Sequence, residues 1–174
     1  MAMMQAAKTL LVTGGSRGIG EAIARDLAAA GAHVFVTGRN AEDAEGIASS
    51  IRTSGGRASG LAYEAANRGA GEALIDSLKE NEHDGQLDIL VNNAGIIRRE
   101  DALDFSEEDW DAVMDTNLKT LFFLCQAAAR HMTGWASQDG ERGKIVNIAS
   151  MLTFQGGIRV PSYTASKSAV GGLT

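Results

Sequence analysis

The chain has 174 residues, of which 44% are hydrophobic and 22% are charged, with one proline and one cysteine. This composition is typical of a folded domain and excludes a mainly disordered chain, while a single cysteine excludes an internal disulfide. The formal net charge of -6 at pH 7, with acids spread along the sequence, argues against a nucleic-acid-binding surface.

The length fits a single domain over residues 1–174. No apolar run reaches the ~18 residues that a membrane helix requires, and the N-terminus lacks the pattern of a secretion signal. We therefore expect a cytoplasmic protein with no membrane partner. Cys125 lies in an apolar stretch and is expected to be a buried, unreactive thiol.

Strands and helices alternate along the chain. Apolar and β-branched runs predict strands over residues 8–13, 33–37, 57–63, 87–91 and 144–149. Apolar residues at helical spacing predict helices over residues 21–31, 41–54, 70–80 and 106–132, the last broken near its middle, and from residue 161 onward. Because strands are separated by helices, the sequence predicts an α/β fold built on a parallel sheet.

Two connections carry further local signals. Ser106 stands three residues before Asp109 and is expected to open the fourth helix with a capping box. Residues 133–143 show no periodicity and are expected to form a surface connection.

A glycine-rich segment, Thr-Gly-Gly-Ser-Arg-Gly-Ile-Gly, occupies residues 13–20 between the first strand and the first helix. In this setting the backbone amides at a helix N-terminus hold a pyrophosphate. The sequence therefore predicts a dinucleotide site. The expected cofactor-binding residues of this segment are Gly14, Ser16, Arg17, Gly18, Ile19 and Gly20.

The end of the second strand discriminates between the two nicotinamide dinucleotides, because an acid there binds the ribose 2′-hydroxyl and a base accommodates a 2′-phosphate. This chain places Arg39 at that turn with no competing acid, and Arg17 lies within the glycine segment. NADP(H) is therefore favoured. NAD(H) stays open, since both arginines also fit ordinary solvated surface charges.

Tyr163 and Lys167 stand four residues apart in a predicted helix, a spacing that places them on one helix face. A lysine ammonium beside a tyrosine hydroxyl favours the charged phenolate form of the tyrosine. Tyr163 is therefore a candidate acid–base group.

The glycine segment, Asn92-Asn93-Ala94-Gly95 after the fourth strand and Tyr163-x-x-x-Lys167 together resemble the short-chain dehydrogenase/reductase family, along the whole chain. The resemblance implies a Rossmann-like, doubly wound parallel sheet and NAD(P)-dependent oxidation or reduction of a small-molecule substrate. It implies that Asn92, Ala94, Gly95, Tyr163 and Lys167 contact the cofactor. The implied catalytic residues are Asn117, Ser150, Tyr163 and Lys167.

The resemblance also implies a role for each of these groups. Tyr163 exchanges the proton of the reacting hydroxyl while the cofactor carries the hydride. Lys167 assists Tyr163 and reaches the nicotinamide ribose. Ser150 donates a hydrogen bond to the substrate oxygen, and Asn117 holds a water that links Lys167 to solvent.

Two features depart from the family pattern. The third strand is followed by Tyr63-Glu64-Ala65-Ala66-Asn67, where many relatives carry an aspartate near the adenine. The sequence also ends at Thr174, before the later strands, the cofactor loop and the substrate-covering segment of the family. We therefore expect a C-terminally incomplete domain; if the chain instead ended here, its fifth strand would lie at an open sheet edge, which favours oligomerisation. The family implies a homodimer or homotetramer formed through the helices that contain Asn117 and Pro161.

Arginines near the reaction centre suggest an anionic substrate. Arg98 and Arg99 follow the Asn-Asn-Ala-Gly motif, and Arg159 lies between Ser150 and Tyr163. Guanidinium groups bind carboxylates, and these segments resemble the sugar-acid branch of the family, which includes 2-deoxy-D-gluconate 3-dehydrogenases and gluconate 5-dehydrogenases. The branch implies 2-deoxy-gluconate, gluconate or a keto form as substrate. It often uses NAD(H), in conflict with Arg39, and the three arginines also fit surface or subunit salt bridges.

Two alternatives stay open. Within the family, the enzyme could be a 3-oxoacyl carrier-protein reductase, whereas outside enzymology a chain this short could be a non-catalytic dinucleotide-binding module. No metal site is expected, because His33, His83 and His131 show no ligand spacing.

Overall fold

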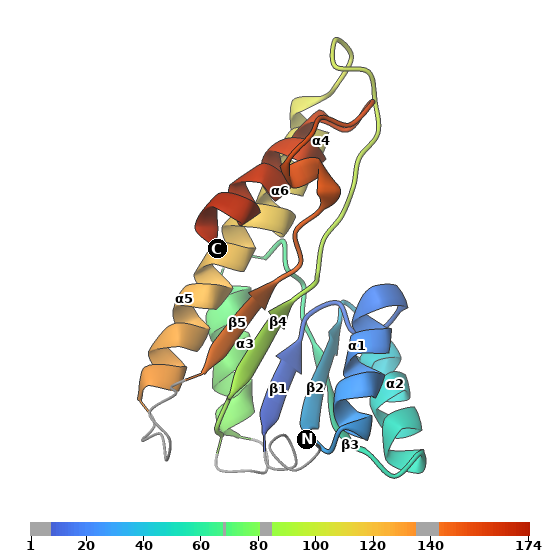
Figure 1. Ribbon diagram of the computed structural model, residues 1–174, viewed down its shortest axis with the longest axis vertical. Coiled ribbons are helices and arrows are strands. Elements are labelled where there is room, and N and C mark those ends of the chain that lie inside the picture. The colour runs from blue at the N-terminus through green and yellow to red at the C-terminus, as the bar shows by residue number, and fades with distance from the viewer. Residues whose placement is uncertain (1–7, 68, 81–84, 135–142) are drawn as a thin grey trace.

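The computed structural model describes residues 8–67, 69–80, 85–134 and 143–174, and within them it contains a five-stranded sheet (Figure 1). The strands are β1 (Thr9–Val12), β2 (His33–Gly38), β3 (Arg57–Ala62), β4 (Ile89–Asn92) and β5 (Lys144–Asn147). Their order in the sheet is β3-β2-β1-β4-β5, and every neighbouring pair is parallel. The predicted α/β fold with a parallel sheet is therefore confirmed.

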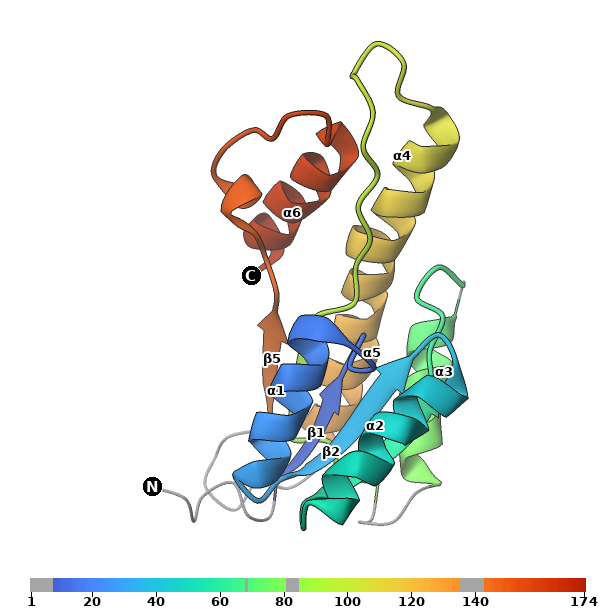
Figure 2. The same ribbon diagram turned by 90° about the vertical axis from the view of Figure 1, so that its right-hand side faces the viewer.

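Helices cover both faces of this sheet, as a doubly wound fold requires. Helices α1 (Gly18–Ala29) and α2 (Ala41–Thr53) lie on one face, and α3 (Ala70–Lys79) and α5 (Thr120–Thr133) lie on the other (Figure 2). Successive side chains of β1 alternate between two apolar cores, because residues two apart share a face of a strand. Leu10 and Val12 pack under α1 and α2, whereas Leu11 packs under α3 and α5.

The long helical region breaks near its middle, as predicted. Helix α4 (Glu107–Met114) passes into a π-helical turn, η1 (Asp115–Lys119), before α5 begins. The predicted capping box at its start is only half formed. Ser106 accepts a hydrogen bond from the Asp109 amide at 3.2 Å, but the Asp109 carboxylate pairs with Arg98 instead of reaching back. Aspartate is one methylene shorter than the glutamate that normally completes this motif.

The last described helix, α6 (Pro161–Leu173), packs against α4, η1 and the short 3₁₀ helix η2 (Met151–Thr153). Pro161 occupies its first turn, where no backbone donor is needed. Strand β5 lies at an edge of the sheet, as expected, and Val146 is 45% exposed there.

Element boundaries differ from the predictions at several points. Strand pairing in β4 begins at Ile89, although Leu87 is buried, and α1 begins at Gly18 inside the glycine segment. Thr133 belongs to α5, and most of the predicted connection, residues 135–142, lies outside the described residues. Among the helices that the structure describes, none has the length and apolarity to span a bilayer.

Candidate functional site

The glycine segment and the Asn-Asn-Ala-Gly motif meet beyond the carboxyl ends of β1 and β4. The chain leaves β1 toward β2 and leaves β4 toward β5, so a crevice opens between the two connections. The Thr13 hydroxyl accepts hydrogen bonds from the amides of Asn93 and Ala94, both at 3.0 Å. The Asn93 side chain donates to the carbonyl oxygens of Thr13 and Gly14 at 3.0 and 3.1 Å. Asn93 belongs to the motif, but no functional role was predicted for it; in the structure it joins the two connections.

Two of the glycines are required by close approach of neighbouring backbone. Gly14 has a φ of 62°, and a Cβ there would lie 3.0 Å from the Cα of Ala94. A Cβ on Gly20 would lie 2.2 Å from the carbonyl oxygen of Gly14 and 2.5 Å from the side-chain nitrogen of Asn93. The start of α1 can lie this close to the segment only with glycine at position 20.

The N-terminus of α1 is open to solvent. Its N-cap residue, Arg17, makes no side-chain capping bond, and Gly18 and Ile19 are exposed, Ile19 by 68%. Gly18 has a φ of 59°, and a Cβ there would meet no atom within 4 Å. Uncapped amides at a helix N-terminus carry a partial positive charge, so these residues fit the pyrophosphate of a dinucleotide.

The two basic residues predicted to select the cofactor are Arg17, at the N-cap of α1, and Arg39, directly after β2. Arg17 and Arg39 are both exposed, and neither forms an ion pair with any residue that the structure describes. Ser16 lies against Gly38 at the end of β2, where a Cβ on Gly38 would be 2.9 Å from the Ser16 side chain. The turn after β2 is therefore next to the glycine segment, as the predicted selection of the cofactor requires.

The side chain of Asn92 is engaged inside the fold. It is 4% exposed and donates to the Asn147 side-chain oxygen at 2.9 Å and to the Cys125 sulfur at 3.1 Å. Asn92 therefore steadies β4 against β5 and α5. Cys125 is only half-buried, so the prediction of a buried thiol was too strong, although burial raises its pKa.

Lys167 and Tyr163 lie on the same side of α6, as their spacing predicted. The Lys167 ammonium is 5.8 Å from the centroid of the Tyr163 ring. Lys167 is 4% exposed and donates to the carbonyl oxygen of Ile148, just after β5, at 2.5 Å. Burial lowers the pKa of Lys167. A lysine held in this way is a charged group retained in the interior at an energetic cost.

Asn117 connects the segment after β4 to α6. It lies in the π-helical turn, is 1% exposed, and bonds both backbone groups of Ile96 at 2.8 Å, accepting from the amide and donating to the carbonyl. Its side-chain nitrogen also donates to Ser166 at 3.3 Å. Gly95 is beside it, since a Cβ there would lie 3.2 Å from the Asn117 side-chain oxygen. A π-helical turn inserts one extra residue into a helix, and such turns are frequent at functional sites.

Ser150 precedes η2 with a donor to spare. Its hydroxyl accepts from the Leu152 amide at 3.2 Å, and its own amide donates to the Thr153 hydroxyl at 3.3 Å. The hydroxyl proton of Ser150 has no acceptor among the described residues. The Ser150 hydroxyl can therefore donate a hydrogen bond to the oxygen of a bound molecule.

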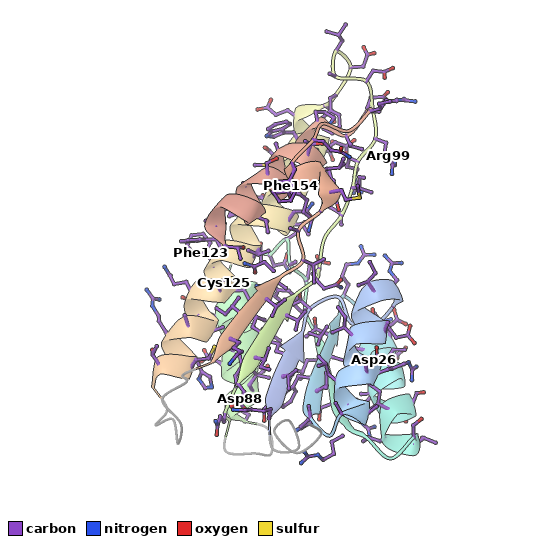
Figure 3. All side chains as sticks on the ribbon, viewed as in Figure 1. Asp26, Asp88, Arg99, Phe123, Cys125 and Phe154 are labelled. Atoms are coloured by element: carbon purple, nitrogen blue, oxygen red, sulfur yellow. The ribbon has the colours of Figure 1, made fainter. Side chains whose placement is uncertain are left out.

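The three candidate substrate arginines differ in their contacts. Arg98 pairs with Asp109 at 2.9 Å, and Arg159 pairs with Glu100 at 2.8 Å and Asp101 at 3.2 Å. Arg99 is exposed and pairs with none of the described residues. Figure 3 shows Arg99 and Phe154 on two connections at the same end of the molecule, beyond the tips of the strands. The alternative of surface salt bridges therefore holds for Arg98 and Arg159 in this structure, whereas Arg99 is available.

Comparison with known proteins agrees with this geometry. Residues 8–174 match the family model described as short chain dehydrogenase. The 2-dehydro-3-deoxy-D-gluconate 5-dehydrogenase of Escherichia coli (strain K12) is 48% identical over 96% of this chain and 63% of its own length. Gluconate 5-dehydrogenase of Gluconobacter oxydans (strain 621H) is 44% identical over 94% of this chain and 61% of its own length.

The chain is also similar to a solved structure. The crystal structure of gluconate 5-dehydrogenase from Burkholderia cenocepacia J2315, in complex with NADP and tartrate, superimposes with a TM-score of 0.87 at 40% sequence identity. The match covers 96% of this chain and 63% of that chain. The chain thus spans less than two thirds of the length of these relatives.

Proposed function

Because the chain belongs to the short-chain dehydrogenase family, we propose that it acts in the NAD(P)-dependent interconversion of a secondary alcohol and a ketone. The observation that carries this proposal is the buried Lys167 ammonium, held 5.8 Å from the Tyr163 ring on one face of α6. Lys167 has no carboxylate partner among the described residues, so its burial is unfavourable for stability. Perturbed titratable groups of this kind cluster at functional sites.

In this proposal, each group has one task. When bound, the nicotinamide cofactor supplies the site that accepts or donates hydride. In alcohol oxidation the Tyr163 side chain acts as the phenolate and takes the proton of the substrate hydroxyl, and in ketone reduction the neutral Tyr163 hydroxyl donates a proton to the substrate oxygen. The Ser150 hydroxyl donates a hydrogen bond to the substrate oxygen and keeps its proton. Asn117 holds the segment after β4 against α6, and so fixes Tyr163 relative to the crevice.

The proposed cofactor is NADP(H), with NAD(H) as the alternative. The pyrophosphate would lie on the open amides at the start of α1, next to Gly14, Gly18 and Gly20. Arg39 and Arg17 would pair with a 2′-phosphate, which is supported by their exposure and by their lack of ion pairs among the described residues. The Burkholderia cenocepacia relative was solved with NADP, which also supports this choice.

The proposed substrate is a sugar acid such as 2-deoxy-gluconate or gluconate, or its keto form. The names of the relatives from Escherichia coli and Gluconobacter oxydans support this class. Arg99 is the carboxylate-binding residue that we favour, because Arg98 and Arg159 are already neutralised by neighbouring acids.

We also propose that the protein is a homodimer or homotetramer formed through α4, α5 and α6. The outer surface of the first two helices carries large apolar side chains, as Phe122 is 43% exposed, Phe123 53% and Trp110 39%. Phe122 and Phe123 pack edge to face with each other, with ring centroids 5.4 Å apart. Exposed aromatic groups of this kind are enriched at protein interfaces.

The test is a turnover assay with NADP⁺ or NAD⁺ and a panel of gluconate, 2-deoxy-gluconate, neutral sugar alcohols and an acetoacetyl thioester, followed by the absorbance of the reduced nicotinamide. We expect turnover of sugar acids, and Tyr163→Phe should lower kcat by roughly 10²–10⁴-fold while cofactor affinity is kept. Full activity of Tyr163→Phe would overturn the mechanism. Turnover of the thioester alone would favour the carrier-protein reductase, and cofactor binding without any turnover would favour the non-catalytic module.

A further inference from the structure

Thr153, the last residue of η2, joins the two chain segments that carry Ser150 and Lys167. Its hydroxyl accepts a hydrogen bond from the Ser150 amide at 3.3 Å and donates one to the Lys167 carbonyl oxygen at 3.0 Å. A hydroxyl can donate one hydrogen bond and accept another, so the Thr153 hydroxyl acts here as donor and acceptor at the same time. A single side chain thus links the backbone of two proposed catalytic residues.

Further contacts fix Thr153 on one turn of α6. Its carbonyl oxygen accepts from the Ser168 hydroxyl at 3.3 Å. Its methyl group lies over Gly171, where a Cβ would come within 2.5 Å of the Thr153 Cγ2. The hydroxyl of Thr153 therefore bonds η2 to the helix, and the absence of a side chain at Gly171 leaves room for the Thr153 methyl group.

Apolar packing adds little to the placement of this turn. Met151, the first residue of the turn, is 77% exposed, and Phe154, directly after the turn, is 91% exposed, so both side chains lie in solvent. Leu152 is half-buried, against Gly157 and Val160 of its own connection. The hydrogen bonds between η2 and the helix of Tyr163 and Lys167 that the structure describes are those of Thr153.

We propose that Thr153 is a positioning residue, whose hydroxyl sets Ser150 at its working distance from Tyr163 and Lys167. This proposal deepens the function proposed above and rests on it. Loss of the hydroxyl leaves the Ser150 amide without an acceptor and frees the turn to shift. Since a displacement of about 1 Å between reacting groups can cost ~10²-fold in rate, the effect falls on kcat and not on cofactor binding.

The first experiment compares Thr153→Val, which keeps the shape without the hydroxyl, with Thr153→Ser, which keeps the hydroxyl. For each we measure kcat and KM with gluconate and NADP⁺, the Kd for NADP⁺, and hydrogen exchange of the Ser150 amide by NMR. We expect Thr153→Val to lower kcat by roughly 10–10²-fold, to change KM and Kd by less than about threefold, and to speed exchange at Ser150. Thr153→Ser should match the unsubstituted protein.

The second experiment disturbs the same contact from the other side. Gly171→Ala pushes against the Thr153 methyl group, whereas a Cβ on the adjacent Gly172 meets no atom within 4 Å, so Gly172→Ala is the matched control. Gly171→Ala should lower kcat and speed exchange at Ser150, and Gly172→Ala should do neither. Because Thr153→Ser removes the methyl group, Gly171→Ala in that background should regain both values.

Equal kcat and equal Ser150 exchange in Thr153→Val and Thr153→Ser would overturn the proposal. So would an equal loss of NADP⁺ affinity and kcat in Thr153→Val, since that result indicates general loss of structure. If the unsubstituted protein turns over no sugar acid, the proposed function fails on that ground. The exchange comparison and the rescue by Thr153→Ser still decide whether Thr153 positions Ser150.

Discussion

Replacement of Lys167 by methionine tests whether the buried charge lowers the stability of the fold while it serves the proposed turnover. Lys167 is 4% exposed, its ammonium has one hydrogen bond, to the Ile148 carbonyl, and no carboxylate of the described residues pairs with it. Methionine fills nearly the same volume without a charge. We expect Lys167→Met to abolish the proposed turnover and, at neutral pH, to unfold less readily than the unsubstituted protein.

The expected size of the gain follows from opposing effects. The substitution loses a hydrogen bond made by a charged group, worth about 1.5–3 kcal/mol. It also removes the desolvation penalty of the ammonium, which is several kcal/mol for an ion in a protein interior. We therefore expect a net gain of about 1–2 kcal/mol in the free energy of unfolding at pH 7. For a chain of this size, each kcal/mol raises Tm by about 2–4 °C.

The pH dependence of the stability difference is a second, independent test of this reasoning. Burial lowers the pKa of Lys167 in the folded state below its ordinary value of 10.5. Between the lowered value and 10.5 the unfolded chain binds more protons at this lysine than the folded chain does. The contribution of Lys167 to the free energy of unfolding therefore rises with pH across that window. Methionine has no such dependence, and the advantage of Lys167→Met should shrink as pH rises toward 10.5.

The assay is urea unfolding of both proteins, followed by circular dichroism from neutral pH to pH 10. Lys119→Met is the control, because Lys119 is exposed and makes only a surface pair with Asp115, so its removal should change stability by less than about 0.5 kcal/mol. A Lys167→Met protein that is less stable at pH 7, or whose advantage grows with pH, would refute the reasoning.

Four further predictions test other parts of the molecule. Gly20→Ala should lower the free energy of unfolding by about 1–3 kcal/mol and weaken NADP⁺ binding. Gly46→Ala, where a Cβ meets nothing within 4 Å, should raise the free energy of unfolding by about 0.5–1 kcal/mol. Thermal unfolding and cofactor titration of both variants check these values. Arg39→Ala should raise the Kd for NADP⁺ by about tenfold or more and leave that for NAD⁺ within about twofold, and tighter NAD⁺ binding that ignores the substitution would contradict the NADP(H) assignment. Arg99→Ala should raise KM for gluconate at least about tenfold and leave a neutral sugar alcohol unaffected, as judged by steady-state kinetics. Phe123→Ser should shift the protein to a smaller oligomer in sedimentation velocity, and an unchanged mass would argue against the α4–α5 interface.

Most elements of the fold could be predicted from the sequence because each has a strong local cause. The three central strands, β1, β2 and β4, are almost wholly buried and therefore read as largely apolar runs. The predicted strand boundaries are wrong where a residue is buried but does not pair with a neighbouring strand. Leu87 is an example, since it is buried although strand pairing begins at Ile89. The start of α1 at Gly18 was missed because glycine disfavours helices, and its place there is dictated by the backbone that passes over Gly20.

The members of the candidate site could be predicted, but most of their partners could not. The spacing of Tyr163 and Lys167 in a helix was sufficient to place them on one face. The pairing of Arg159 with Glu100 joins residues 59 positions apart, and no local pattern indicates it. The choice among the three arginines therefore needed the structure, which leaves Arg99 without an acidic partner among the described residues.

Four side chains that bring these segments together make a kind of contact that explains this limit. Each bonds backbone of another segment: Asn93 the carbonyls of residues 13 and 14, Asn117 both groups of residue 96, Thr153 the carbonyl of residue 167, and Lys167 the carbonyl of residue 148. Backbone groups are the same whatever side chain a residue carries, so such a partner leaves no mark in the sequence. The same property lets the segments between the motifs vary in composition while the polar side chains that bind them keep the geometry of the site.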